Sequence, residues 1–271
     1  MKGRIFCFAL LFCLLCAALA LPNATADTGK ILVVNEKHLE VKAFDQGDYV
    51  SLYALCLALG EASAKVTANE AVTISVTKSD LCATATEGQH YIVANGRYRY
   101  CDSPNLYQNK VLYVPLSSAL WAIGATITEE QGAYCFLETN EAAAVAAKNY
   151  AEDEVLWLSR IIHAESGNQP LAGKIAVGTV VMNRVDSPEY PNTIYSVIFD
   201  RQYGVQFTPA ENGTVWCNPS EESVLAAKCV LEGYRTDPDI LFFMNEEIAV
   251  STWISDNCDY AFTIADHSFW S

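Results

Sequence analysis

Apolar residues recur at helical spacing along the second half of the chain, between turns rich in Gly, Pro and Asn. The pattern predicts four helices, at about 154–165, 171–184, 193–199 and 219–232. The second of these is apolar over most of its circumference, so we expect it at the centre of its domain. Two strand-like stretches nearer the end, 240–244 and 260–264, are expected to form a small hairpin beside the helices.

The first half alternates apolar and polar residues, as strands do, and contains an internal repeat. Residues 49–60 read as a strand, a short helix and a glycine, and residues 113–124 repeat that order. An alternating run broken by polar turn residues follows each copy, which is typical of a β-hairpin. Between the copies, Asn95-Gly96 separates two further strand-like runs and predicts a type I′ hairpin. This half is therefore predicted to be a small α+β domain.

The N-terminus reads as a secretory signal peptide, because Lys2 and Arg4 precede an apolar run that ends in small residues. The run is too short for a comfortable membrane span, with an uncleaved anchor as the alternative, and no later segment approaches a span. We therefore expect an exported α+β protein of two domains. Its predicted parts are a signal peptide at 1–26, the strand-helix-hairpin repeat domain at 31–140, a linker at 141–152 and a mainly α-helical domain with a small hairpin at 153–271.

The formal net charge of −15 narrows the choice of partner. Binding to nucleic acid needs clusters of Lys and Arg, which the chain lacks, so no nucleic-acid partner is expected. An anionic polymer would have to be held by hydrogen bonds and aromatic stacking instead. The oligomeric state stays open at this point.

Seven cysteines follow the predicted signal peptide, an odd number that cannot pair completely within one chain. Export makes disulfides plausible, and the seven include no Cys-x-x-Cys pair of the kind that binds zinc. We select Cys82 with Cys101 as a disulfide, because both lie on strand-like segments that flank a hairpin. Cys56 and Cys229 fall on apolar helix faces and are expected to be buried thiols.

Glu165 is the candidate catalytic residue because of its place on a helix. It shares one face with Leu158, Ile161 and Ile162, and Ser166-Gly167 ends the helix behind it. Burial raises the pKa of a Glu, and a carboxylic acid that keeps its proton near neutral pH can donate it to a leaving oxygen. Position alone favours the alternative, a Glu in the last turn whose side chain bends out to solvent.

Several motifs of the second half resemble, in order and spacing, the SleB/CwlJ family of cell wall hydrolases. They are 154–165, 173–185, 191–198, Gln206-Phe207, 242–245 and 267–269. The resemblance implies a lysozyme-like helical domain that cleaves the glycan strand of peptidoglycan, in the spore-cortex members as a lytic transglycosylase. It also implies Glu165 as the catalytic Glu, which protonates the glycosidic oxygen and then takes a proton from the C6 hydroxyl of the substrate, closing a 1,6-anhydro ring. A hydrolase would need a second carboxylate, and the nearest rival, Glu211, reads as a solvated loop acid.

The same resemblance suggests residues that bind substrate. Gln206 and Phe207 are similar to a pair that lines the family's cleft, where the amide holds sugar groups and the ring packs on a pyranose, with core packing as the alternative for Phe207. Asn183 and Asn245 would hydrogen-bond across the site or orient the catalytic Glu, unless they cap local backbone groups. Tyr203 and Asn245 are further candidate binders. Other aromatic candidates for a sugar groove are Trp216, Trp253 and Tyr260, unless they belong to the core.

A zinc site made by His163, Glu165 and His267 is the rival interpretation of these polar residues. Side chains two positions apart on a helix diverge by about 200°, so His163 and Glu165 would not share a metal. We therefore expect no metal and no cofactor, with a structural or supporting role for both histidines.

The repeat of the first half resembles the copper amine oxidase N-terminal-like domain found on many exported bacterial proteins. Its histidines, His38 and His90, are far apart in the sequence, so no copper site is expected, and we interpret the domain as a stalk or wall-adhering module. Together the patterns predict an exported peptidoglycan lytic transglycosylase of the cell wall or spore cortex. The alternatives are a non-catalytic wall-binding protein on the same fold and a muramidase-type hydrolase.

Overall fold

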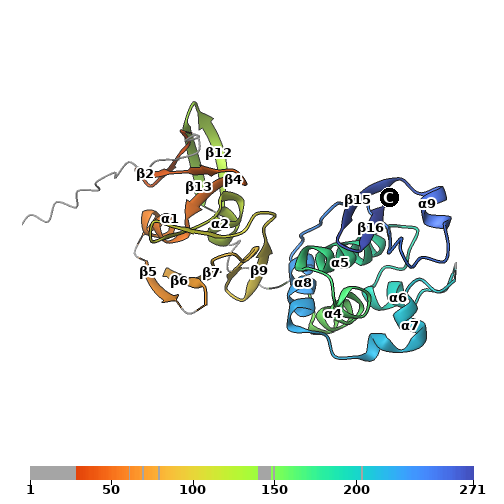
Figure 1. Ribbon diagram of the computed structural model, residues 1–271. Coiled ribbons are helices and arrows are strands. Elements are labelled where there is room, and N and C mark those ends of the chain that lie inside the picture. The colour runs from red at the N-terminus through yellow and green to blue at the C-terminus, as the bar shows by residue number, and fades with distance from the viewer. Residues whose placement is uncertain are drawn as a thin grey trace, which may run out of the picture.

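The structure is a computed structural model that describes residues 29–60, 62–68, 70–78, 80–139, 148, 150–202 and 204–271. The predicted signal peptide and most of the predicted linker lie outside these residues. Figure 1 shows an N-terminal part built mainly of strands, residues 29–139, and a C-terminal part built mainly of helices, residues 150–271. Among the described residues, no helix is long and apolar enough to cross a membrane.

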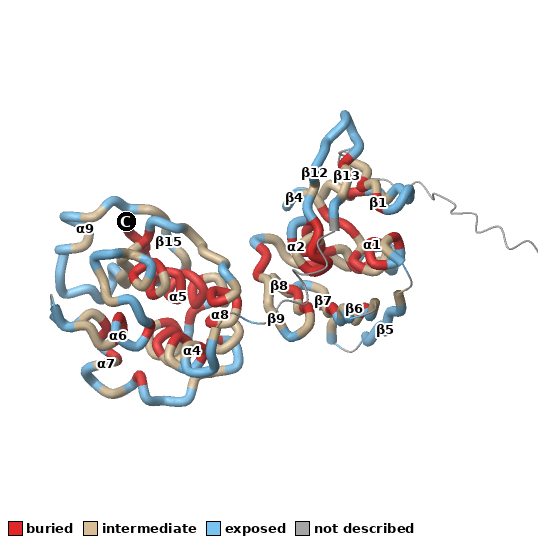
Figure 2. The backbone as a smooth tube through the Cα atoms, turned by 180° about the vertical axis from the view of Figure 1, so that it is seen from behind, coloured by how far each residue is buried: buried red, intermediate tan, exposed pale blue. Residues whose placement is uncertain are grey.

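The N-terminal part consists of three sheets around two helices. Its elements are β1 (Ile31–Val34), β2 (Lys37–Glu40), β3 (Lys42–Phe44), β4 (Gly47–Ser51), α1 (Leu52–Leu59), β5 (Ser63–Ala68), β6 (Val72–Lys78), β7 (Leu81–Thr86), β8 (Tyr91–Ala94), β9 (Arg97–Tyr100), β10 (Leu106–Gln108), β11 (Val111–Pro115), α2 (Leu116–Ile123), β12 (Ala125–Gln131) and β13 (Tyr134–Thr139). The strand orders are β12-β13-β1-β2, β10-β11-β4-β3 and β5-β6-β7-β8-β9. The buried residues of α1 and α2, red in Figure 2, supply much of the apolar core between the sheets.

Both segments that carry the repeated pattern form a strand followed directly by a helix. β4 and β11 pair antiparallel in one sheet, so the two copies lie side by side. Ser51 begins α1 by accepting a hydrogen bond from the backbone N–H of Ala54. Gly124 ends α2 in the left-handed conformation, with a φ of 63°, which glycine adopts without steric cost.

The predicted type I′ hairpin is confirmed. β8 and β9 pair antiparallel with Ala94 opposite Arg97. Both turn residues have positive φ, 50° for Asn95 and 76° for Gly96, as this turn requires. The alternating runs after each repeat also form the expected hairpins, β5 with β6 and β12 with β13.

The predicted disulfide between Cys82 and Cys101 is wrong, since both thiols are free. Cys82 lies on β7 and Cys101 follows β9, and β8 runs between these two strands. Two strand spacings amount to roughly 9–10 Å, which is more than a disulfide can bridge. The Cys101 thiol instead lies 2.8 Å from the Ser118 hydroxyl in the core. Cys56 and Cys229 are fully buried, as predicted.

The C-terminal part is mainly helical. Its elements are α4 (Glu152–Ser166), α5 (Leu171–Asp186), α6 (Ile194–Ile198), α7 (Thr208–Asn212), the 3₁₀ helix η1 (Thr214–Trp216), α8 (Glu221–Leu231), β14 (Phe242–Met244), α9 (Trp253–Asn257), β15 (Tyr260–Ile264) and β16 (His267–Trp270). The four predicted helices are present with small shifts of their ends, whereas α7, η1 and α9 were not predicted. α5 packs between its neighbours and is buried along most of its length, as its all-round apolar surface predicted.

The predicted hairpin of this part is wrong. β14 and β15 do not pair with each other, because both pair antiparallel with β16 in the order β14-β16-β15. All four residues of β16 are buried, so its sequence shows no alternation of apolar and polar positions that would mark a strand. The small sheet therefore depends on a central strand that the pattern could not indicate.

Gly178 lets α5 approach its neighbouring helices closely. A Cβ atom there would lie 2.8 Å from Ile162 Cδ1 of α4 and 3.2 Å from Val230 Cγ2 of α8. We expect Gly178→Ala to lower the free energy of unfolding by about 1–3 kcal/mol, because overpacking outweighs the better helix propensity of Ala. Chemical denaturation measures this change. Gly173→Ala in the same helix is the control, since its Cβ would first meet Gln169 Cβ at 3.2 Å, and equal losses in both variants would contradict the argument.

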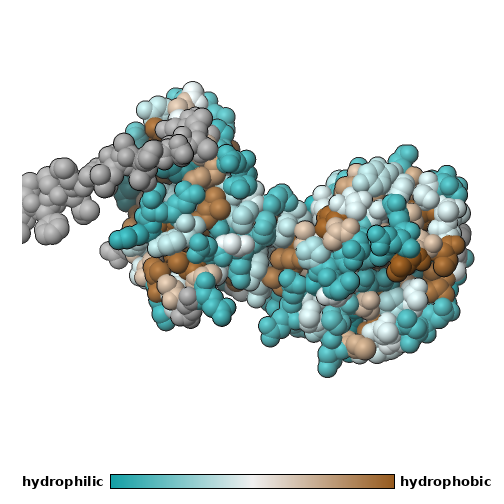
Figure 3. Space-filling view, in the orientation of Figure 1, coloured by the Kyte–Doolittle hydropathy of each residue, from teal (hydrophilic) through white to brown (hydrophobic). Residues whose placement is uncertain are grey.

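The two parts meet where the β8–β9 hairpin contacts α8, at the narrow waist seen in Figure 3. Arg97 of β9 forms an ion pair of 2.6 Å with Glu232, whose side chain is only 1% exposed, and the Tyr150 hydroxyl donates a 2.9 Å hydrogen bond to the same carboxylate. The Tyr100 ring packs edge-on against Tyr234 and belongs to the hydrophobic core of the C-terminal part. The contact is therefore a packed interface with a buried charge pair.

Candidate active site

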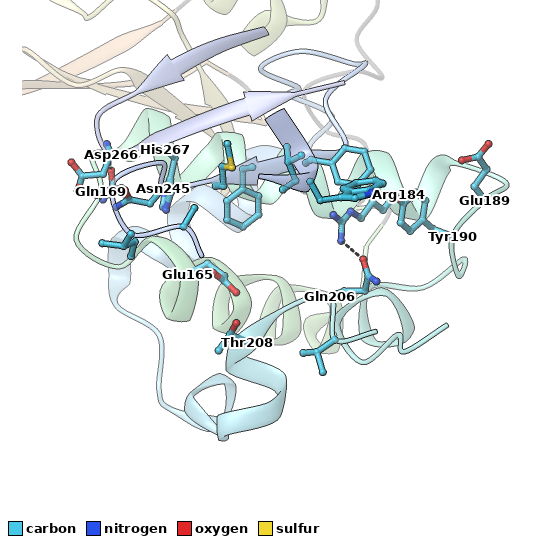
Figure 4. Close-up of a pocket in the computed structure, with 18 of the residues that line it drawn as sticks. Glu165, Gln169, Arg184, Glu189, Tyr190, Gln206, Thr208, Asn245, Asp266 and His267 are labelled. Carbon is cyan, nitrogen blue, oxygen red and sulfur yellow. Dashed lines mark hydrogen bonds between the residues drawn. The ribbon is translucent and has the colours of Figure 1, made fainter. Parts of the chain in front are cut away.

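A pocket of about 1590 Å³ opens in the C-terminal part (Figure 4). Its wall is formed by the end of α4, the end of α5 with the loop that follows, the segment before α7, and the strands and loops of the small sheet. α9, which contributes Trp253 to the wall, lies on the side of the C-terminal part away from β9 (Figure 1). The N-terminal part therefore leaves this side of the pocket uncovered.

Glu165 reaches the pocket from the last turn of α4. The residues that share its helix face, Leu158, Ile161 and Ile162, are fully buried, as the helical spacing predicted. Glu165 itself lies at the pocket surface, with Thr208 beside its carboxylate in Figure 4. Gly167 completes the turn behind it, where a Cβ atom would lie 2.6 Å from the carbonyl oxygen of His163.

Burial raises the pKa of Glu165 from 4.5 to about 7, and the positive charge of Arg184 opposes this shift only in part. At neutral pH a substantial fraction of the Glu165 side chains therefore keeps its proton. A protonated carboxylic acid in a pocket is the group that general acid catalysis requires.

The raised pKa of Glu165 also makes folding stability depend on pH. Below pH 4.5 the folded and unfolded states both hold the proton. As the pH rises to about 7 the unfolded state releases it first, so the protein loses about 3 kcal/mol of folding stability between these pH values. We therefore expect Glu165→Gln to be more stable than the wild type at about pH 8 and nearly equal to it at about pH 4. Urea denaturation at both pH values measures the difference, and a difference independent of pH would contradict the burial of this carboxyl group.

Arg184, which the sequence did not single out, organises the opposite end of the pocket. Its Nε donates a 2.8 Å hydrogen bond to the carbonyl oxygen of Leu241, and its Nη1 donates one of 3.3 Å to Oε1 of Gln206. The guanidinium also lies 5.1 Å from the Tyr190 ring centre and 5.2 Å from that of Phe207. Burial lowers the pKa of Arg184, but a guanidinium stays charged in proteins, so the pocket holds a fixed cation.

The predicted binding residues divide into two groups. Gln206 and Asn245 line the pocket. Phe207 is 2% exposed and packs in the core beneath Arg184, so its predicted stacking on a sugar ring is wrong. Asn183 is also wrong as a pocket residue, because its Nδ2 donates to the carbonyl oxygens of Asp237 and Ile240 and so holds a loop. Tyr203 lies outside the described residues.

Two further acids line the pocket, Glu189 and Asp266. Asp266 accepts a 2.9 Å hydrogen bond from Gln169, and Glu189 lies at the end of the pocket remote from Glu165 in Figure 4. Glu211, the rival suggested by the sequence, is exposed on α7 and is not part of the wall.

The histidines of the rejected zinc interpretation lie in different places. His163 contacts the start of α8, with Nδ1 3.4 Å from the Ser223 hydroxyl, whereas His267 lines the pocket. Of the aromatic candidates, Trp253 lines the pocket, and Tyr260 packs edge-on against Trp270. Trp216 instead joins an aromatic cluster on another surface with Trp157, Tyr195 and Phe199.

The C-terminal part of the chain is similar to a known protein family. Residues 168–270 match the profile of the family described as Cell Wall Hydrolase. The C-terminal part carries a cell wall hydrolase domain. The matched segment contains Arg184, Gln206, Asn245 and His267, and it begins just after Glu165.

Two of the relatives that the chain matches are spore cortex-lytic enzymes. The spore cortex-lytic enzyme of Bacillus cereus is 30% identical over 105 residues, which are 39% of this chain and 39% of that protein. The spore cortex-lytic enzyme of Bacillus subtilis is 28% identical over 114 residues, 41% of this chain and 36% of that protein. The chain thus spans about two fifths of the length of these relatives. A solved structure, the catalytic domain of the germination-specific lytic transglycosylase SleB from Bacillus anthracis, aligns over 46% of this chain and all of its own with 27% identity and a TM-score of 0.42.

Proposed function

We propose that this protein is an exported enzyme that cleaves the glycan strand of peptidoglycan as a lytic transglycosylase, with Glu165 as its general acid and base. The observation that carries the proposal is a single carboxyl group of raised pKa at the surface of a large pocket. The cell wall hydrolase domain and the spore cortex-lytic relatives support the choice of substrate. The spore cortex and the vegetative wall are both candidate forms of that substrate.

The proposed reaction needs one acid. The protonated Glu165 gives its proton to the glycosidic oxygen, and the bond from that oxygen to C1 of the muramic acid breaks. The C6 hydroxyl oxygen of the same sugar bonds to C1, and its proton returns to the Glu165 carboxylate. This reaction consumes no water, so it needs no second carboxylate to activate one. The other two acids of the pocket fit this requirement, because Glu189 lies far from Glu165 and Asp266 is hydrogen-bonded to Gln169.

Gln206 and Asn245 are proposed to hold the sugar by their amide groups. Arg184 fixes the amide of Gln206 by binding its oxygen, which leaves the amide nitrogen as the donor toward the pocket and toward the carbonyl oxygen of Gly204 at 3.3 Å. Trp253 is 56% exposed at the rim, where a ring can pack on a sugar face.

We further propose that residues 31–140 form a separate domain that holds the enzyme at the wall, joined by 141–152 to the catalytic domain at 153–271. The two distinct hydrophobic cores support this division. The resemblance of the repeat to a copper amine oxidase N-terminal-like module stays a prediction.

Digestion of purified peptidoglycan tests the proposed reaction. The protein is incubated with cortex and with vegetative peptidoglycan, and the products are separated and weighed by mass spectrometry. Muropeptides with 1,6-anhydro ends are expected from the wild type and not from Glu165→Gln. Reducing ends in their place would indicate a muramidase, and the absence of products from both substrates would indicate a non-catalytic wall-binding protein.

A further inference from the structure

His267 lies in the pocket with an incomplete set of hydrogen bonds. It begins β16, the central strand of the small sheet, and its side chain lines the pocket although the residue is only 8% exposed. The ring packs edge-on against Phe243, with 5.4 Å between the ring centres. Its Nδ1 atom is buried and has no hydrogen-bond partner in the described structure.

The surroundings of His267 determine the protonation state of its imidazole ring. Burial lowers the pKa of His267 below 6.5, against the smaller opposing effect of Asp266, so the ring is neutral at pH 7. A neutral imidazole carries one N–H, and a buried N–H without an acceptor is rarer than an unpaired acceptor. The proton is therefore assigned to Nε2, because Nδ1 is enclosed and the opposite edge of the ring is the one left open to the pocket.

A second set of contacts fixes where this ring lies relative to Glu165. Gln169 is 4% exposed. Its Nε2 donates a 2.9 Å hydrogen bond to Oδ2 of Asp266, and its Oε1 accepts one of 3.2 Å from the Asp266 backbone N–H. The carbonyl oxygen of Gln169 accepts a 2.6 Å hydrogen bond from the buried Lys174 ammonium. Gln169 lies three residues after the end of α4, so it links the turn before His267 to the end of the helix that carries Glu165. Figure 4 shows Gln169, Asp266 and His267 close to one another.

We propose that His267 donates a hydrogen bond from Nε2 to an oxygen of the bound glycan, and that Gln169 is the positioning residue that holds His267 for this contact. The proposal rests on the proposed function, because it takes the glycan strand as the ligand. A sugar chain offers the acceptors that such a donor needs, in its hydroxyl groups and in the carbonyl oxygens of its acetamido groups. A neutral donor suits these uncharged oxygens.

Binding to intact strands tests the proposal without requiring cleavage. Peptide-free peptidoglycan strands are titrated into Glu165→Gln protein and into the same protein with a second substitution at His267. His267→Met keeps the bulk of the ring and removes the donor, and we expect it to weaken binding about 10-fold. His267→Gln places an amide N–H near the position of Nε2 and is expected to recover most of that loss. Unchanged affinity in His267→Met, or the same loss in both variants, would overturn the proposal.

A double-mutant cycle tests the role of Gln169. Gln169→Met removes both side-chain contacts to Asp266, and we expect weaker binding when His267 is present and little further loss when His267 is already Met. A purely structural role of Gln169 predicts equal losses in both backgrounds and would overturn this part. The ¹⁵N chemical shifts of the His267 ring provide a direct readout: a protonated Nε2 that shifts when strands are added is expected, and a protonated Nδ1 contradicts the assignment.

Two further comparisons define the meaning of these results. Titration with de-N-acetylated strands identifies the glycan oxygen that accepts the hydrogen bond. If His267→Met no longer weakens the binding of these strands, the acceptor is the acetamido carbonyl oxygen; if it still weakens their binding, the acceptor is a hydroxyl group. Both outcomes support the proposal. Cleavage by the wild type is measured in parallel. Failure of cleavage alone overturns the proposed function, whereas an affinity that does not depend on His267 overturns this inference alone.

Discussion

Glu165→Gln is expected to lower the rate of glycan-strand cleavage by about 10³-fold while the protein stays folded. The amide has nearly the size of the carboxylic acid but can neither give its proton to the glycosidic oxygen nor take one from the C6 hydroxyl. Release of soluble muropeptides from peptidoglycan measures the rate, and thermal unfolding verifies the fold.

Glu211→Gln is the matched control for that experiment. It makes the same chemical change on the exposed surface of α7, away from the pocket wall, and is expected to leave the rate within about twofold of the wild type, as surface substitutions do. A Glu165→Gln variant that retains a tenth of the wild-type rate would remove Glu165 from the mechanism. A loss in Glu211→Gln instead would assign the acid to α7.

Arg97→Met is expected to lower the free energy of unfolding by about 3 kcal/mol. It removes the cation from a carboxylate that is 1% exposed and leaves Glu232 with only the Tyr150 hydroxyl among its described partners. A buried charge without a partner lowers the free energy of unfolding by more than the ion pair raises it. Removal of one partner therefore destabilises the protein more than replacement of both partners by apolar residues. Urea denaturation of the complete chain measures the loss.

The companion variants separate burial of charge from loss of packing. Arg97→Met combined with Glu232→Met is expected to regain at least half of the stability that Arg97→Met loses, because no buried charge is left unpaired. Arg201→Met makes the same substitution at an exposed Arg and is expected to change stability by less than about 0.5 kcal/mol. A double variant less stable than Arg97→Met would contradict the electrostatic explanation.

The features predicted well are those that a short stretch of sequence determines. The helix around Glu165 and the hairpin at Asn95-Gly96 follow from local spacing and turn chemistry, and both are present. β16 escaped prediction because burial of all its residues leaves no alternating pattern. β14 and β15 were then assigned to each other, since pairing partners distant in the sequence leave no local mark.

The same difference between local and long-range determinants explains which residues of the pocket could be predicted from the sequence. Glu165 was selected from its helix face together with the resemblance of the surrounding motifs, and the structure places it in the pocket wall. Arg184 was missed because its role comes from contacts with Leu241 and Gln206, which lie far along the chain. Asn183 was misassigned for the same reason, since its side chain turns to a loop that only the folded structure brings near. A motif can therefore mark a segment as functional without saying which of its side chains face the substrate.

The packing of Tyr100 into the core of the C-terminal part has a consequence for recombination of modules. A chimaera that joins the C-terminal part to a different N-terminal module would remove Arg97 from the Glu232 carboxylate and expose an apolar surface around Tyr234 to water. Such a fusion would need to carry the β8–β9 hairpin with it, or to replace Glu232 and Tyr234 by small polar residues. The unit that can be exchanged between proteins is thus larger than the C-terminal part alone.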